Sequence, residues 1–245
     1  MDLFQQQWAT YRAVVEHDLM EHQAVASATM HAIESWLERR PPDAAAPRMV
    51  DLGCGDLALL APWLRGLPLG SYTGLDLTAA VLPLAQQALG PTAYPCRWLE
   101  ADLLRWVGTS DTSTKAEPEA TSTETVDLLH SAFAIHHLSD AQKTTFLEAA
   151  RQRISPSGLF IWVDIFRQPG EAREHYLKRY RQRVRGGWQV LSSEQQEQVI
   201  SHLSSFDIPA DRAAIQAAAE QAGWRWRWGW NGQHQAEALA VLTPA

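Results

Sequence analysis

Val50-Asp51-Leu52-Gly53-Cys54-Gly55-Asp56 is an apolar run that ends in two closely spaced glycines, and a helical pattern follows it over about 57–64. Glycine allows a sharp turn from a strand into a helix, and it lets a ligand approach the main chain closely. The stretch therefore predicts a strand, a turn and a helix with a binding site at the turn. Glycine pairs are common, so an ordinary strand–helix turn would show the same pattern.

The spacing of the acidic residues favours a binding site. Asp76 follows the next predicted strand, 21 residues after Gly55, and Asp102 follows the third. An acid about 20 residues beyond such a turn is placed to accept hydrogen bonds from ribose hydroxyls. Together with Asp51, the first three strands each end in an aspartate. Three carboxylates along one sheet edge repel one another, which argues against a purely structural role.

The rest of the chain extends this unit outward. Periodicity predicts a helix over 2–39, a linker at 41–47 and about five strand–helix repeats. The chain then shows a helix, the alternating run RWRWGW at 225–230 and Asn-Gly at 231–232, a hairpin signal. This order predicts an α/β fold: a doubly wound, mostly parallel seven-stranded sheet with a terminal antiparallel hairpin and a helical cap. We expect the tryptophans of the run to pack on helices rather than on nucleic-acid bases.

The predicted organisation has four parts. Residues 1–40 form an N-terminal helical cap, and 41–165 form the core with the glycine turn. Residues 166–209 form a helical lid insertion, and 210–245 form a helix and hairpin that complete the sheet. The Thr- and Ser-rich stretch 108–125 lacks periodicity, and we expect a disordered surface loop there.

Composition narrows the function classes. The 245 residues include 28 acidic and 21 basic side chains, a net charge of −7, which argues against nucleic-acid binding. Two isolated cysteines form neither a disulfide framework nor a zinc cluster. We see no signal peptide and no apolar run of about 18 residues, so we expect a cytoplasmic protein without membrane contact.

These motifs, taken in order, resemble those of class I S-adenosylmethionine (SAM)-dependent methyltransferases. The resemblance rests on VDLGCGD, GLD, EAD, VDLLHSAFAIHHL and SPSGLFIWVDIF, and it covers about 48–165 closely. The segment at about 210–242 is similar to the family's terminal strand pair. Within the family the chain looks most like a small-molecule branch in which HHL follows the fourth strand.

The resemblance implies SAM as the cofactor and assigns roles to individual residues. Asp51, Gly53, Cys54 and Gly55 would border the amino-acid part of SAM. Asp76 would hold the ribose hydroxyls and Leu77 would contact the adenine. Asp102 would accept a hydrogen bond from the adenine amino group, beside Leu103, and Ser131 would line the cleft. One departure stands out: many members have a glycine two residues after Gly55, where this chain has Leu57.

Two other functions remain open. Gly53-x-Gly55-x-x-Ala58 satisfies the loose dinucleotide fingerprint, so a nucleotide-cofactor oxidoreductase is one rival. No tyrosine–x–x–x–lysine pair for hydride chemistry supports it. The other rival is a methyltransferase-like interaction module that has lost catalysis, although such a module need not keep all three strand-end acids.

Candidate catalytic and acceptor residues follow the fourth strand and lie in the helical parts. His136 and His137 are candidate bases; alternatively His137 caps or packs the turn and His136 is solvated. Adjacent histidines do not readily chelate one metal, and we expect no metal site. Tyr11, on the N-terminal helix, is a candidate acceptor ligand. So are Tyr176, Arg179 and Tyr180, which share a helix face. The expected partner is a small-molecule methyl acceptor, whose identity the sequence leaves open, as it does the oligomeric state.

Overall fold

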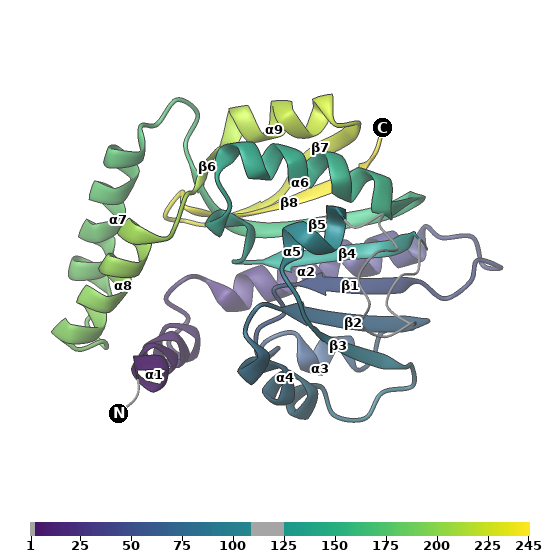
Figure 1. Cartoon of the computed structure of the whole chain (residues 1–245), viewed down its shortest axis with the longest axis horizontal. Coiled ribbons are helices and arrows are strands. Elements are labelled where there is room, and N and C mark those ends of the chain that lie inside the picture. Colours follow the sequence, from purple (N-terminus) through teal and green to yellow (C-terminus); the bar gives the residue numbers. More distant parts are fainter. Residues whose placement is uncertain (1–2, 109–124) are drawn as a thin grey trace.

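The computed structural model describes residues 3–108 and 125–245, so most of the expected surface loop 108–125 lies outside the described residues. Helices flank a single mixed sheet (Figure 1). The described helices are α1 (Leu3–Glu16), α2 (His22–Glu38), α3 (Ala61–Leu64), η1 (Ala79–Val81), α4 (Leu82–Leu89), α5 (Leu103–Gly108), η2 (Ile135–His137), α6 (Asp140–Arg153), α7 (Arg173–Gly187), α8 (Ser193–Ser205) and α9 (Arg212–Gln221).

The sheet confirms the predicted fold class. Its strands are β1 (Arg48–Leu52), β2 (Ser71–Asp76), β3 (Cys96–Glu100), β4 (Val126–Ala132), β5 (Ile154–Arg167), β6 (Ala210–Asp211), β7 (Trp224–Asn231) and β8 (Glu237–Pro244). Seven of them follow the order β3-β2-β1-β4-β5-β8-β7, and the two-residue β6 pairs with the end of β5 as an eighth. Strands β1 to β5 are parallel, whereas β8 is antiparallel to both of its neighbours.

Strand order places the ligand crevice. The chain proceeds from β1 to β2 and β3 on one side, then returns to β4 and β5 on the other. Ligands in open α/β sheets bind outside the carboxyl ends of the strands where the order reverses. Here that position lies between β1 and β4, directly after the glycine turn.

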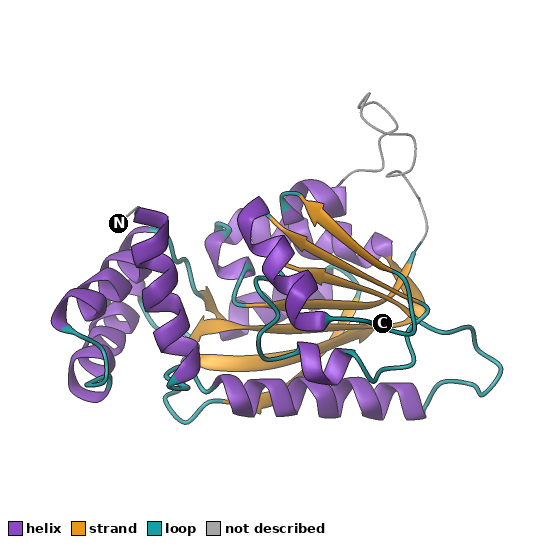
Figure 2. Cartoon of the chain, turned by 90° about the horizontal axis from the view of Figure 1, so that it is seen from below, coloured by secondary structure: helices purple, strands orange, loops and turns teal. Residues whose placement is uncertain are grey.

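Each face of the sheet has its own hydrophobic core, and Figure 2 shows helices on both sides. Helices α2, α3 and α4 pack on one face around Met49 and Leu128. Helices α5, α6 and α9 pack on the other face around Phe160 and Trp162. Strand β7 has the expected alternation, because its tryptophans are buried or half-buried and the residues between them are exposed.

Helices α1, α7 and α8 form a third cluster beyond one end of the sheet, as Figures 1 and 2 both show. We call these three helices the cap. The cap has its own core, made of Val14 with α7 and α8 residues such as Val184 and Leu203. The Thr10 hydroxyl donates a hydrogen bond to Gln198 Oε1 at 2.6 Å, which joins α1 to α8.

The single helix predicted over 2–39 is wrong, because the chain forms α1 and α2 with a break at 17–21. Asp18 and Glu21 both adopt left-handed backbone angles, with φ of 54° and 58°. The Asp18 carboxylate accepts a hydrogen bond from the Gln23 amide at 2.9 Å, which stabilises the corner. The break turns α1 away from the sheet and into the cap.

Among the residues the structure describes, none of the helices is long and apolar enough to cross a membrane.

Candidate cofactor and acceptor site

A cavity of about 530 Å³ opens at the carboxyl ends of β1, β2 and β4. Its volume lies within the range of about 300–1,000 Å³ that small-molecule sites occupy. Eight of the nine residues expected to hold the cofactor line it: Asp51, Gly53, Cys54, Gly55, Asp76, Leu77, Asp102 and Leu103. The fold therefore brings together residues that are spread over three strand ends.

The glycine turn needs its glycines for two reasons. Gly53 and Gly55 have φ of 73° and 54°, in the left-handed region that glycine tolerates best. A Cβ on Gly53 would also stand 2.5 Å from the Cβ of Ala134, so the turn packs directly against the segment after β4. The amides of Gly53 and Cys54 both donate to the Leu75 carbonyl, which holds the turn against β2.

The carboxylates of Asp76 and Asp102 already have backbone partners. Asp76 Oδ2 accepts from the Gly55 amide at 3.0 Å, and Oδ1 accepts from the Thr78 amide at 2.8 Å. Asp102 Oδ1 accepts from the Arg105 amide at 2.8 Å at the start of α5. These bonds orient both carboxylates along the cavity wall, and their ligand roles stay predictions.

Asp51 belongs to a buried polar cluster, of which Asp51 alone was predicted from the sequence. Its carboxylate accepts from the Tyr72 hydroxyl at 3.0 Å, and His130 Nδ1 lies 2.7 Å from its Oδ1. Burial, and then the Asp51 charge, raise the pKa of Tyr72 well above its ordinary value. His130 lines the cavity, and its Nε2 has no partner among the described residues. The alternation of side chains along β4 could have predicted His130, because His130 and Ala132 lie two residues apart and so share the face that lines the cavity.

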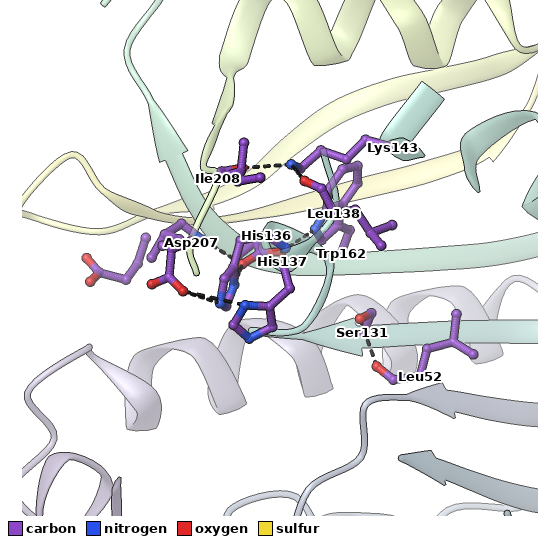
Figure 3. A network of polar contacts seen from close by, with 12 residues as sticks. Leu52, Ser131, His136, His137, Leu138, Lys143, Trp162, Asp207 and Ile208 are labelled. Carbon is purple, nitrogen blue, oxygen red and sulfur yellow. Dashed lines mark hydrogen bonds and ion pairs between the residues drawn. The ribbon is translucent and has the colours of Figure 1, made fainter. Parts of the chain in front are cut away.

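Ser131 does not line the cavity, which corrects the prediction for that residue. It is fully buried, and its hydroxyl donates to the Leu52 carbonyl at 2.8 Å (Figure 3). Successive strand residues point to opposite faces, so His130 and Ala132 face the cavity while Ser131 joins β4 to β1.

Helix α1 of the cap, the start of α2 and the segment after β4 provide the remaining wall of the cavity. Tyr11 lies on this wall, as predicted for an acceptor residue, and burial and Asp56 raise the pKa of its hydroxyl. The other residues of this wall are mostly apolar, and they are Trp8, Val15, Met20, His22, Val25, Ala26, Phe133 and His137. His22 is buried, and its ring meets the Phe133 ring edge-on at 5.5 Å.

The two candidate catalytic histidines have different surroundings (Figure 3). His137 is half-exposed and lines the cavity, whereas His136 is buried, does not line it, and faces Asp164. His136 Nδ1 lies 2.5 Å from Asp164 Oδ1. Burial alone would lower the pKa of His136, but Asp164 raises it above its ordinary value. Burial and the neighbouring His136 lower the pKa of His137. The geometry therefore leaves His137 as the catalytic candidate.

Tyr176, Arg179 and Tyr180 do not reach the cavity, and their prediction as acceptor ligands is not supported by their positions. Both tyrosines are buried in the core of the cap. Arg179 forms a two-point ion pair with Glu171, with its Nε 2.6 Å from Oε1. Tyr176, Arg179 and Tyr180 do share one face of α7, but this face packs against the rest of the protein.

Comparison with known proteins identifies the domain around this cavity. Residues 50–160 match the sequence profile of a family described as a methyltransferase domain. This match supports the expected methyltransferase family for this segment of the chain. No curated protein sequence is recognisably similar to the chain.

Solved structures show the same fold at low sequence identity. The human N-acetylserotonin methyltransferase in complex with SAM has a TM-score of 0.53 and 15% identity, over 93% of this chain and 55% of that one. DhpI in complex with S-adenosylhomocysteine (SAH) has a TM-score of 0.52 and 16% identity, over 96% and 98%. The cyclopropane synthase MmaA2 from Mycobacterium tuberculosis has a TM-score of 0.50 and 15% identity, over 75% and 57%. The chain thus spans little more than half the length of the first and third of these proteins.

Proposed function

We propose that the chain transfers the SAM methyl group to a small-molecule acceptor, because residues 50–160 match the profile of a methyltransferase domain. The observation that supports the proposal is the cavity itself, which is lined by eight of the nine residues expected to hold the cofactor. The same cavity continues beyond them to a second wall, so cofactor and acceptor would share one enclosed space.

The charges around the cavity suit this cofactor. Asp51, Asp56, Asp76 and Asp102 line it, and its described lining includes neither lysine nor arginine. SAM has a sulfonium and an ammonium cation against a single carboxylate. A cavity lined by carboxylates favours such a cation, whereas the phosphates of a dinucleotide would be repelled.

The second wall suggests the kind of acceptor. Trp8, Val15, Met20 and Phe133 present apolar surface, with His137 as a polar group beside them. We propose a small, mostly apolar acceptor whose nucleophilic oxygen or nitrogen contacts His137. His137 would then be the catalytic residue of the chain.

The reaction would be an in-line attack of the acceptor atom on the methyl group. SAM supplies a sulfonium, which is already a strong electrophile. The protein's contribution is to orient both reactants and to exclude water, an effect that can lower the barrier by several kcal/mol. The close packing of Gly53 against Ala134 keeps the turn between these elements rigid.

Two measurements on the intact chain test the proposal. Titration calorimetry should show binding of SAM and SAH and no comparable binding of NADH. Methyl-labelled SAM should then transfer label to at least one member of a panel of small phenols, hydroxy acids and amines. NADH binding without SAM binding would replace the proposal with an oxidoreductase. SAM binding without any release of SAH across the panel would contradict catalysis and favour an interaction module.

A further inference from the structure

Three imidazoles surround one carboxylate oxygen where the cap meets the core (Figure 3 shows two of the three). Asp207, in the loop after α8, places its Oδ1 3.5 Å from His136 Nε2 and 3.5 Å from His137 Nδ1. His202, on α8 itself, has its Nε2 3.4 Å from the same oxygen. The donor atoms of His136, His137 and Asp207 all lie within 4.8 Å of one another.

The separations are too long for the hydrogen bonds that such groups normally make. Charged N–H···O bonds measure about 2.7–2.9 Å. Asp207 is 6% exposed, and its Oδ1 has no hydrogen-bond partner among the described residues. A buried carboxylate oxygen without a hydrogen bond is costly, so the site lacks a partner for it.

The same separations suit a metal ion. Zinc binds imidazole nitrogen and carboxylate oxygen at about 2.0–2.2 Å in a tetrahedral arrangement, which sets neighbouring ligand atoms about 3.3–3.6 Å apart. The distances of 3.5 Å from Asp207 Oδ1 to His136 Nε2 and to His137 Nδ1 lie within this range, and all three donor atoms lie within 4.8 Å of one another. A rotation of the side chains toward one point would bring the three atoms into coordination range.

Asp164 prepares His136 for this role. Its buried carboxylate accepts from the backbone amides of His136 and Ile165, from Trp162 Nε1, and from His136 Nδ1. With Nδ1 donating to Asp164, the Nε2 of a neutral His136 ring would have its lone pair available to an ion beside Asp207 Oδ1. Metal-bound histidines almost always donate their other ring N–H to a carboxylate or carbonyl in this way.

We propose that His136, His137 and Asp207 bind a divalent transition-metal ion such as Zn²⁺, and that His202 holds Asp207 in place. Imidazole and carboxylate ligands select zinc and its neighbours over Mg²⁺ or Ca²⁺, which prefer oxygen ligands alone. The adjacent histidines come from η2, and Asp207 comes from the loop after α8. The ion would fasten the cap to the core at the edge of the cavity. The inference shares His137 with the proposed methyl transfer, but its test measures zinc affinity and melting temperature, so failure of one proposal is distinguishable from failure of the other.

The test is metal binding by the full chain, purified without a polyhistidine tag and stripped with a chelator. Titration with Zn²⁺ against a chromophoric chelator should show one ion per chain, checked by elemental analysis. Asp207→Asn and His137→Gln should each lower the affinity at least about tenfold, since even residues that support a metal ligand typically change it 10–100-fold. His202→Gln should lower it less. Zn²⁺ should also raise the melting temperature of the parent chain, because a ligand that binds the folded state stabilises it.

His31→Gln is the matched control, since His31 is an exposed histidine on α2 and should leave binding unchanged. The His137 variant keeps the test decisive if Asp207→Asn fails to fold, because the His137 side chain is 45% exposed. Zinc binding that is the same in the parent and the ligand variants would overturn the proposal. So would a stripped chain that binds no zinc, and the cluster would then be an ion-pair network only.

Discussion

At position 57 a leucine adopts a backbone conformation that normally favours glycine. Its φ is 55°, and its side chain is 4% exposed within the core on the α2 face. This is the position at which the resemblance leads one to expect a further glycine. The chain therefore keeps the turn and accepts strain, which costs roughly 1–2 kcal/mol for a left-handed residue with a Cβ. Burial of the leucine side chain offsets that strain.

Replacing Leu57 tests this balance. Leu57→Ala loses the buried side chain and keeps the strain, whereas Leu57→Gly loses the side chain and relieves it. We therefore expect Leu57→Gly to be more stable than Leu57→Ala by about 1 kcal/mol, the reverse of the usual order in helices and strands. Urea unfolding of the two variants measures the difference. An alanine variant that is the more stable of the two would contradict the strained backbone at this position.

Asp76 offers a residue-scale test of cofactor binding. Asp76→Asn keeps one of the two oxygens that accept backbone hydrogen bonds from Gly55 and Thr78, and it removes the charge. Hydrogen bonds to charged groups contribute about 1.5–3 kcal/mol, so the Kd for SAM should rise at least about tenfold. Calorimetry on the variant and on the exposed control Asp43→Asn gives the comparison. An unchanged Kd in a folded Asp76→Asn protein would exclude a ribose contact by its carboxylate.

His22 should make stability depend on pH. Burial lowers its pKa to about 4 from 6.5, opposed by Asp18 and assisted by Arg183. The unfolded chain then binds a proton at this residue below about pH 6.5, while the folded protein does not until about pH 4. The contribution of neutral His22 to the free energy of unfolding is therefore complete above pH 6.5. It is lost progressively as the pH falls, and the loss reaches the order of 3 kcal/mol near pH 4.

Urea unfolding at pH 7.5 and pH 5 measures this effect. His22→Phe removes the titrating group, so the variant should lose about 2 kcal/mol less stability than the parent between these two pH values. Equal losses in both proteins would show that His22 is protonated in the folded state as readily as in the unfolded one.

Residue by residue, the sequence predicted the binding turn well because spacing alone determines it. Gly53, Gly55, Asp76 and Asp102 lie where a strand–turn–helix pattern puts them, and all line the cavity. The prediction that Ser131 lines the cavity was wrong, because it depends on which face of β4 points to the cavity. A shift of one residue along a strand reverses that face, and the hydrophobic pattern of a strand that is buried on both sides does not reveal it.

At the scale of elements, Lys143 connects α6 to the loop that ends the cap. Its buried ammonium donates to the carbonyls of Leu138 and Ile208, and burial lowers its pKa to about 8. Lys143→Met would leave two buried carbonyls without a donor, at about 1–3 kcal/mol each. We expect the free energy of unfolding to fall by about 2–4 kcal/mol.

Chemical unfolding of Lys143→Met beside Lys178→Met measures this contribution. Lys178 is exposed on α7, and its replacement should change stability by less than about 0.5 kcal/mol. A Lys143→Met protein as stable as the control would mean that water replaces the ammonium at both carbonyls.

The order of elements was predictable because apolar periodicity records which face of each element is buried. Two boundaries of elements could not be predicted from this pattern. Nothing in the apolar pattern over 2–39 marks the corner at Asp18, since the pattern continues through it. Asn-Gly at 231–232 suggested a two-residue turn, but β8 begins only at Glu237. The register shift between Trp228 and Trp230 displaces the end of β7, so a local turn preference was overridden by sheet pairing.

For the whole molecule, the cap should respond to the cofactor because α1 lines the cavity. Trp8, Tyr11 and Val15 all border it, while α9 packs on the sheet face covered by α5 and α6 and lies outside the lining. We expect hydrogen exchange in α1 to slow when SAH is added and exchange in α9 to remain unchanged. Mass spectrometry of the exchanged peptides measures both. Equal protection of α1 with and without SAH would show that α1 does not close on the cofactor.

No local sequence pattern shows which residues that are far apart in the chain meet in the fold. Asp207 meets His136 only because the cap insertion folds back over the end of β4. The sequence reasoning expected no metal ligands, since it considered spacing along the chain. A donor set that joins 136–137 to Asp207 can be found only when the path of α7 and α8 is known.

The four aspartates around the cavity have a consequence for the end of the reaction. Methyl transfer converts a sulfonium into a neutral thioether, so the spent cofactor has one positive charge fewer than the molecule that entered. Asp51, Asp56, Asp76 and Asp102 keep their places, and no described lysine or arginine in the lining compensates for the change. The loss of one positive charge weakens the attraction between the cofactor and the carboxylates of the cavity. The electrostatics would therefore hold SAM more tightly than SAH, and this difference in affinity should be largest at low salt.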